Sequence, residues 1–183
     1  MIAALAGRRI DGPAPGVCRF PSDRIDMVKR AIQTRLREDG VRALVCAAAC
    51  GADLLALEAA GELGIRRHIV LPFPVKVFKE GSVTDRECPL DFGKLYDRFV
   101  REAQDANDLR LLELNADDPQ AYEKTNEAIL DDARAIASAQ EDEVEALAVW
   151  DKRLQSEHDY TAHFIHQAER RHVVVRSIPI LDA

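Results

Sequence analysis

The chain has 183 residues, of which 47% are hydrophobic and 31% are charged, and its formal net charge is −7 at pH 7. These values predict one globular domain over residues 1–183, and because no apolar run approaches the ~20 residues of a membrane span, we expect no membrane partner. The acidic balance lacks the basic footprint of DNA- and RNA-binding proteins, so we also expect no nucleic-acid partner, although two local arginines suffice for one nucleotide phosphate.

Short apolar runs alternate with helical patterns along the chain. The apolar runs are bounded by glycine, proline or charged residues, as is typical of buried strands. Two of the helical patterns are followed by a glycine, Gly40 and Gly64, where helices commonly end. In chain order, the expected elements are a strand over 2–6, a helix over 22–39, a strand over 43–48, a helix over 52–63, a strand over 68–71, a helical or irregular region over 75–106, a strand over 109–114, a helix over 118–139, a strand over 145–150, a helix over 161–171 and a strand over 173–178.

Strands that are separated by helices indicate an α/β fold. We expect a three-layer sandwich, in which a mainly parallel sheet of about six strands has helices on both faces. Ligands of open parallel sheets bind beyond the carboxyl ends of the strands. The residues that follow each expected strand are therefore the candidates for a binding site.

The first two expected strands end in turns that suit an anion. Where a helix directly follows a strand, the first backbone N–H groups of the helix are free to bind an anion. Glycine lets a ligand approach the backbone closely, and arginine can pair with a phosphate through two hydrogen bonds. Simpler roles remain open, because an arginine is also a common surface charge, a glycine a tight turn, and an acidic residue a partner of the helix dipole. The candidates at these two turns are Gly7, Arg8, Arg9, Asp11, Cys50, Gly51, Ala52 and Asp53.

Three further candidates follow the fifth expected strand. Trp150 either packs at the mouth of the core or stacks on a base. Asp151 either caps the next turn or holds a ribose hydroxyl, or acts in acid–base chemistry. Thr161 at a helix N-terminus is either a simple N-cap or a phosphate ligand. On the long helix over 118–139, Tyr122 and Asn126 are one turn apart and so share a face that can point into the cleft.

The sequence predicts neither a metal site nor a cofactor. Its four cysteines, Cys18, Cys46, Cys50 and Cys88, lack the close paired spacing of zinc ligands and are expected to be free thiols. The apolar N-terminus has no basic segment before it and runs into Gly7, so it predicts a strand and not a signal peptide. A cytoplasmic location is therefore expected.

Several short motifs resemble bacterial proteins of the SLOG superfamily, in matching order along nearly the whole chain. They begin at Ala6 (Ala-Gly-Arg-Arg-Ile-Asp), Cys50 (Cys-Gly-Ala-Asp-Leu-Leu), Val70 (Val-Leu-Pro-Phe-Pro), Ala121 (Ala-Tyr-Glu), Ala148 (Ala-Val-Trp-Asp) and Thr161 (Thr-Ala-His-Phe). That superfamily groups Rossmann-like domains related to the LOG phosphoribohydrolases and to the DNA-processing protein A fold. The resemblance implies a Rossmann-like fold, a nucleotide or NAD-derived ligand at the strand ends and, by analogy, a homodimer.

One segment departs from the family pattern. LOG enzymes bind phosphate with a Pro-Gly-Gly-x-Gly-Thr loop, whereas the matching segment here, 156–161, keeps Thr161 but has no glycine. No glutamate follows Thr161 until Glu169, although the family pattern has one on that helix. Bulky residues would crowd a phosphate cradle built of glycines. If a phosphate is bound, the turns at Gly7–Arg8 and Cys50–Ala52 are then expected to carry more of the contact.

The leading hypothesis is a sensor domain that binds a nucleotide or nucleotide-derived small molecule. The alternative is an enzyme that cleaves an N-glycosidic bond, of the nucleotide phosphoribohydrolase or nucleoside deoxyribosyltransferase type. In that case Asp53, Glu58, Asp151 or Asp159 would supply the carboxylate, and the sequence does not choose among them. A third possibility is an interaction domain whose cleft has closed.

Overall fold

The computed structural model describes residues 1–13, 16–154 and 159–181. Within these ranges a six-stranded sheet has the order β4-β3-β2-β1-β5-β6, and every neighbouring pair is parallel. The strands are β1 (Ile2–Gly7), β2 (Ala43–Cys46), β3 (Arg66–Leu71), β4 (Leu109–Leu111), β5 (Val144–Trp150) and β6 (Val174–Pro179). The helices are α1 (Ile25–Glu38), which follows the short 3-10 helix η1 (Ser22–Arg24), then α2 (Ala52–Glu62), α3 (Val75–Ser82), α4 (Phe92–Asp105), α5 (Ala121–Ala139) and α6 (Tyr160–Arg170).

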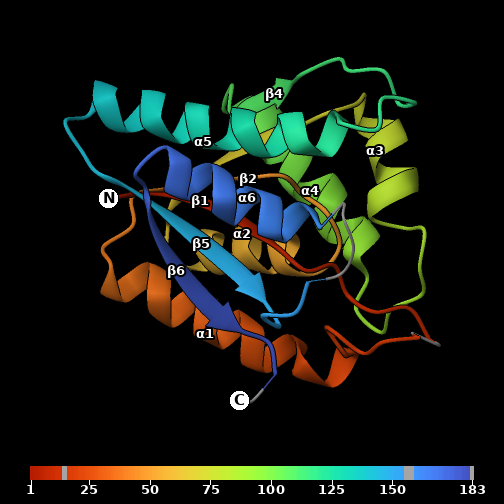
Figure 1. Cartoon of the computed structure of the whole chain (residues 1–183). Helices are drawn as coiled ribbons and strands as arrows, with labels where there is room; N and C mark the ends of the chain where they lie inside the picture. The colour runs from red at the N-terminus through yellow and green to blue at the C-terminus, as the bar shows by residue number, and fades with distance from the viewer. Residues whose placement is uncertain (14–15, 155–158, 182–183) are drawn as a thin grey trace.

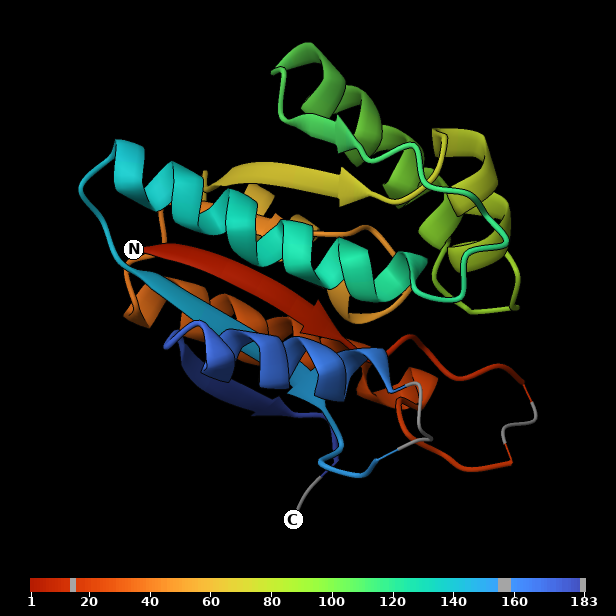
Figure 2. The ribbon, with the colours of Figure 1, turned by 45° about the horizontal axis from the view of Figure 1, so that its top comes forward.

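The sheet is covered on both faces, which confirms the expected Rossmann-like α/β sandwich (Figure 1). In Figure 2, α5 and α6 lie in front of the sheet, while α1 and α2 lie behind it. Both faces of β1 are buried because its side chains alternate between two cores: Ala3 and Leu5 pack with the layer of α1 and α2, and Ile2 and Ala4 pack with α5 and α6. The purely apolar sequence of β1 follows from this double burial.

The chain reverses its direction of winding next to β1. From β1 it steps outward through β2 and β3 to β4, and α5 then carries it back to β5 on the other side of β1. The helices accordingly change faces between the two halves, as right-handed crossovers require. In open α/β sheets a crevice for ligands forms at such a switch point, beyond the carboxyl ends of the strands. Here that point lies between β1 and β5.

The element boundaries differ from the expected ones where local backbone geometry intervenes. β4 ends at Leu111 and not at residue 114, because Glu113 adopts a positive φ of 53°, which breaks the extended conformation. α5 begins at Ala121, since Asp118 instead forms a turn in which its side chain accepts the Gln120 N–H at 2.9 Å. The region 75–106 resolves into α3 and α4. Among the described residues, no helix is both long and apolar enough to cross a lipid bilayer.

Two carboxyl groups meet at the end of the sheet where β5 begins. Glu145 on β5 is 4% exposed and lies beside Asp39, which follows α1. One oxygen of each side chain, Glu145 Oε1 and Asp39 Oδ2, is buried without a hydrogen-bond partner in the described part of the chain. Burial, and then the neighbouring Asp39, raise the pKa of Glu145 to about 7, against the opposing effect of Arg176 and Arg35. A single proton shared by the two carboxyl groups would satisfy both oxygens.

This pair makes stability depend on pH. The pKa of Glu145 is raised in the folded protein, so its protonated form is favoured there, and the stabilisation is lost as the pH rises from ~4.3, the unfolded value, through about 7. We expect Glu145→Gln to match the wild type in Tm at pH 5 and to exceed it by a few degrees at pH 8.5, as measured by differential scanning fluorimetry. Glu143→Gln, at an exposed position on the same segment, is the control. A difference between Glu145→Gln and the wild type that does not change with pH would contradict the shared proton.

Candidate functional site

A cavity of about 350 Å³ lies beyond the carboxyl ends of β1 and β2, beside the switch point. The elements around it are the loop after β1, the turn before α2, the end of α3, the first turns of α5 and the start of α6. The residues singled out from the sequence that line it are Gly7, Arg8, Arg9, Asp11, Asp53, Tyr122, Asn126 and Thr161. The other candidates are not part of the cavity wall: Cys50, Gly51 and Ala52 directly precede Asp53 in the chain, and Trp150 and Asp151 lie at the end of β5.

The two turns that the sequence predicted to suit an anion are hydrogen-bonded to each other. The N–H of Ala52 donates to the carbonyl of Arg8 at 3.1 Å, and the N–H of Ile10 donates to the carbonyl of Cys50 at 3.2 Å. The N–H of Cys50 donates to the carbonyl of Ser82 at 3.0 Å. These N–H groups, which the sequence reasoning left free for a phosphate, are therefore engaged within the protein.

Close packing explains both glycines. A Cβ at Gly7 would lie 2.4 Å from the Cβ of Ala52 and 2.8 Å from the Cβ of Val149, well inside van der Waals contact. Gly51 has a φ of 107°, which favours glycine, and a Cβ there would lie 2.6 Å from the backbone nitrogen of Ile10. These glycines therefore allow the two turns to pack closely against each other.

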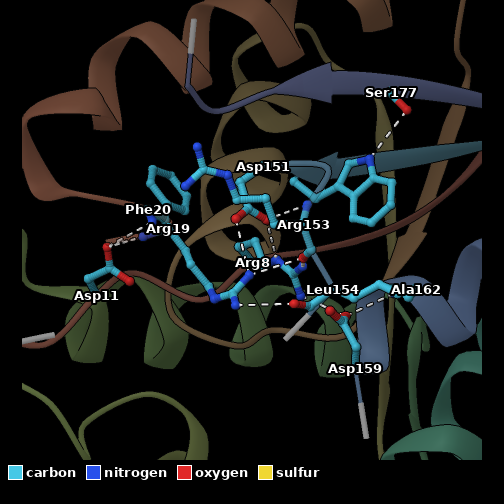
Figure 3. A network of polar contacts seen from close by, with 11 residues as sticks. Arg8, Asp11, Arg19, Phe20, Asp151, Arg153, Leu154, Asp159, Ala162 and Ser177 are labelled. Carbon is cyan, nitrogen blue, oxygen red and sulfur yellow. Dashed lines mark hydrogen bonds and ion pairs between the residues drawn. The ribbon is translucent and has the colours of Figure 1, made fainter. Parts of the chain in front are cut away.

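Arg8 is the centre of a buried ion-pair network (Figure 3). Its Nε lies 3.0 Å from Asp151 Oδ1, its Nη1 lies 2.6 Å from Asp159 Oδ1, and its Nη2 donates to the carbonyl of Arg153. Burial alone lowers the pKa of the guanidinium, but Asp159 and Asp151 raise it above its ordinary value, so the charge persists. The guanidinium also lies 5.8 Å from the centroid of the Trp150 ring, whose N–H reaches Ser177 on β6 at 3.4 Å.

Both carboxylates of this network accept further bonds from protein groups. The side chain of Asp151 is 0% exposed and also accepts a bond from Arg19 Nη1 at 3.1 Å. Asp159 is the N-cap of α6 and accepts the Ala162 N–H at 3.0 Å. Residues 155–158, which include the first half of the segment 156–161 compared with the LOG phosphate loop, lie outside the described residues.

Asp53 is the carboxylate that faces the cavity from the first turn of α2. It is 7% exposed, and its Oδ2 accepts the N–H of Ala49 at 3.1 Å. Burial raises its pKa to about 7, against the opposing effects of the Ala49 N–H and of the nearby Arg9. Burial thus favours the protonated form of Asp53. Glu58, further along α2, instead pairs with Lys29 at 2.9 Å outside the cavity.

Aromatic rings form the wall made by α5 and α6. The ring centroids of Tyr122 and Tyr160 lie 5.1 Å apart, and Phe73 packs edge-on against Tyr122 at 5.8 Å. The Tyr122 hydroxyl shares a hydrogen bond of 2.8 Å with Ser82 Oγ, and Asn126 Nδ2 donates to the carbonyl of Tyr160 at 2.7 Å. Tyr122 and Asn126 therefore share the cleft-facing side of α5, as their spacing suggested.

Sequence reasoning did not single out five polar residues of the cavity wall, Arg19, Ser82, Arg86, Thr125 and Tyr160. Arg19 belongs to an Arg-Phe-Pro segment in the loop before η1, and Tyr160 precedes the candidate Thr161, so both had a nearby signal. Arg86 comes from the loop between α3 and α4, where no periodic pattern or strand end marks a site. The other arginine at that end of the cavity, Arg9, pairs with Asp85 and lies 3.5 Å from Cys50 Sγ.

No protein-family model matches the chain, and no curated protein matches its sequence. A search of solved structures finds the X-ray structure of DNA processing protein A (DprA) from Streptococcus pneumoniae, with a TM-score of 0.39 and 14% sequence identity. The match covers 96% of this chain and 57% of that one, so the chain spans little more than half the length of the solved protein.

The comparison corrects one expectation. DprA is named as a DNA-processing protein, which contradicts the expectation of no nucleic-acid partner; that expectation rested on the acidic net charge alone, was wrong and is withdrawn. The physical reason is that net charge sums the whole chain and does not report local groups such as the four arginines at this cavity. The homodimer implied by the family resemblance stays a prediction.

Proposed function

We propose that the chain is a SLOG-type Rossmann-like domain that binds a nucleotide or nucleotide-derived small molecule as a sensor. The observation that carries the proposal is one cavity at the switch point that combines guanidinium groups with a pair of tyrosine rings. Guanidinium groups suit a phosphate, and tyrosine rings suit the flat face of a base. The position agrees with the general rule for ligands of open α/β sheets.

The state of the carboxylates favours binding over turnover. Asp151 and Asp159 are both held by Arg8, so neither is free to stabilise a developing positive charge on a sugar. Glu58 is held by Lys29 outside the cavity. Three of the four carboxylates weighed for catalysis thus have structural partners, and a sensor needs only the binding cavity.

The binding function has a direct test by isothermal titration calorimetry. The wild type is expected to bind at least one compound in a panel of nucleoside 5′-monophosphates, cyclic nucleotides and ADP-ribose. Tyr122→Ala removes one ring of the aromatic wall and is expected to weaken that binding about 5- to 150-fold, which corresponds to the ~1–3 kcal/mol of base stacking.

Leu111→Ala is the matched control, because it shortens a half-exposed apolar side chain on β4 that does not touch the cavity. It is expected to leave the affinity unchanged. No binding of any compound by a wild-type protein with a cooperative melting transition would overturn the proposed function.

A second candidate function, cleavage of an N-glycosidic bond, is favoured by one observation. Asp53 is a buried carboxylate in the cavity wall with a pKa raised to about 7, as is common at catalytic positions. Its ionised form would stabilise the oxocarbenium-like sugar in the transition state.

Under this second candidate, the protein releases free base from a nucleoside 5′-monophosphate, and the rate rises as the pH passes about 7, because Asp53 ionises there. Asp53→Asn is expected to abolish release at every pH while the melting temperature stays within a few degrees. The measurement is chromatography of the free base. Binding of monophosphates without any release of base would exclude the enzyme and leave the sensor.

A further inference from the structure

Resting on the proposed function, we propose that Arg9 and Arg86 form the phosphate subsite of the cavity, and that the ligand is a mononucleotide whose base lies against Tyr122 and Tyr160. The two ends of the cavity then differ: the phosphate-binding end lies at the loop between α3 and α4, and the aromatic end lies at α5 and α6. Arg8 and Arg19, although they line the same cavity, are assigned to the protein framework.

Charge balance separates the two pairs of arginines. Arg8 and Arg19 face two buried carboxylates, Asp151 and Asp159, so their two positive charges are matched. Arg9 and Arg86 contact one carboxylate between them, Asp85, which is about as exposed as they are. One positive charge in this second pair is therefore available to an anion at the cavity wall.

The hydrogen-bond donors of Arg9 and Arg86 are also incompletely used. The Nε–H groups of both side chains are buried and have no acceptor within the described residues. Arg86 is held by two contacts, from Nη1 to the carbonyl of Ile10 at 2.7 Å and from Nη2 to Asp85 at 3.4 Å, and Arg9 is held by its contacts to Asp85 and Cys50. Each guanidinium group thus keeps a donor that the described protein groups leave unsatisfied, and a phosphate beside the pair would supply acceptors.

The neighbouring groups permit an anion. Burial raises the pKa of the Cys50 thiol, which thus stays neutral between the two arginines. Asp53 near Arg9 takes up a proton close to neutral pH, which removes a repulsive charge, and one oxygen of Asp11 already accepts the N–H groups of Arg19 and Phe20 at 2.8 Å. Within the described residues, Asp85 is the carboxylate that contacts the pair.

Ser82 connects the two ends of the cavity. Its hydroxyl bonds the Tyr122 hydroxyl at 2.8 Å, and its carbonyl accepts the N–H of Cys50, whose sulfur lies 3.5 Å from Arg9 Nη2. The phosphate-binding and aromatic ends are thus separated by a single residue and its contacts. The volume of about 350 Å³ lies near the small end of the ~300–1,000 Å³ range of ligand pockets, which favours a mononucleotide over a dinucleotide.

The test compares each nucleoside 5′-monophosphate with its nucleoside by calorimetry. The wild type is expected to bind the monophosphate at least tenfold more tightly. In Arg86→Gln that preference falls to less than threefold, while the affinity for the nucleoside stays the same. Arg98→Gln, which removes an equal charge from α4 outside the cavity, keeps the full preference.

A second measurement does not depend on a variant that folds. Inorganic phosphate at millimolar concentration is expected to weaken the apparent affinity of the wild type for the monophosphate and not for the nucleoside. Equal affinity of the wild type for both compounds, or an equal weakening of both in a folded Arg86→Gln protein, would overturn the phosphate subsite and leave the proposed function intact. If neither compound nor any other nucleotide binds, the proposed function itself fails.

Discussion

The buried charge of Arg8 is the constraint on which the rest of this site depends. A guanidinium that is 5% exposed is tolerated only when carboxylates and carbonyls surround it. Its two carboxylates come from the end of β5 and from the N-cap of α6, so the network joins the two strands of the switch point to the helix that follows. The wall of the cavity made by these elements is thereby fixed before any ligand arrives.

The same network determines which groups remain for chemistry. Because Asp151 and Asp159 are occupied by Arg8, the buried carboxylate that remains in the described part of the cavity wall is Asp53, whose pKa is raised to about 7. Because the turns at Gly7 and Gly51 bond to each other, the backbone N–H groups of Ile10, Cys50 and Ala52 already have protein acceptors. Side chains from distant loops, above all Arg86, take their place at the wall.

The sequence was sufficient for the fold and for part of the site. Alternating apolar runs and helical patterns predicted the strands and helices, since local periodicity follows burial on one or two faces. The spacing of Tyr122 and Asn126 predicted a shared face of α5 for the same local reason. Partners that lie far apart in the chain were not predictable: Arg8 and Asp151 are 143 positions apart, and nothing local shows that they meet.

The close packing of Gly7 against Ala52 affects how the results of mutagenesis at these two positions should be interpreted. Any larger side chain at either position pushes the loop after β1 away from α2, and with it Arg8 and Arg9, which follow Gly7 directly. In a saturation scan for ligand response, these two small residues would therefore score as intolerant as true ligand contacts. Their intolerance would reflect the distance between two turns, and recognition would have to be inferred from positions with longer side chains.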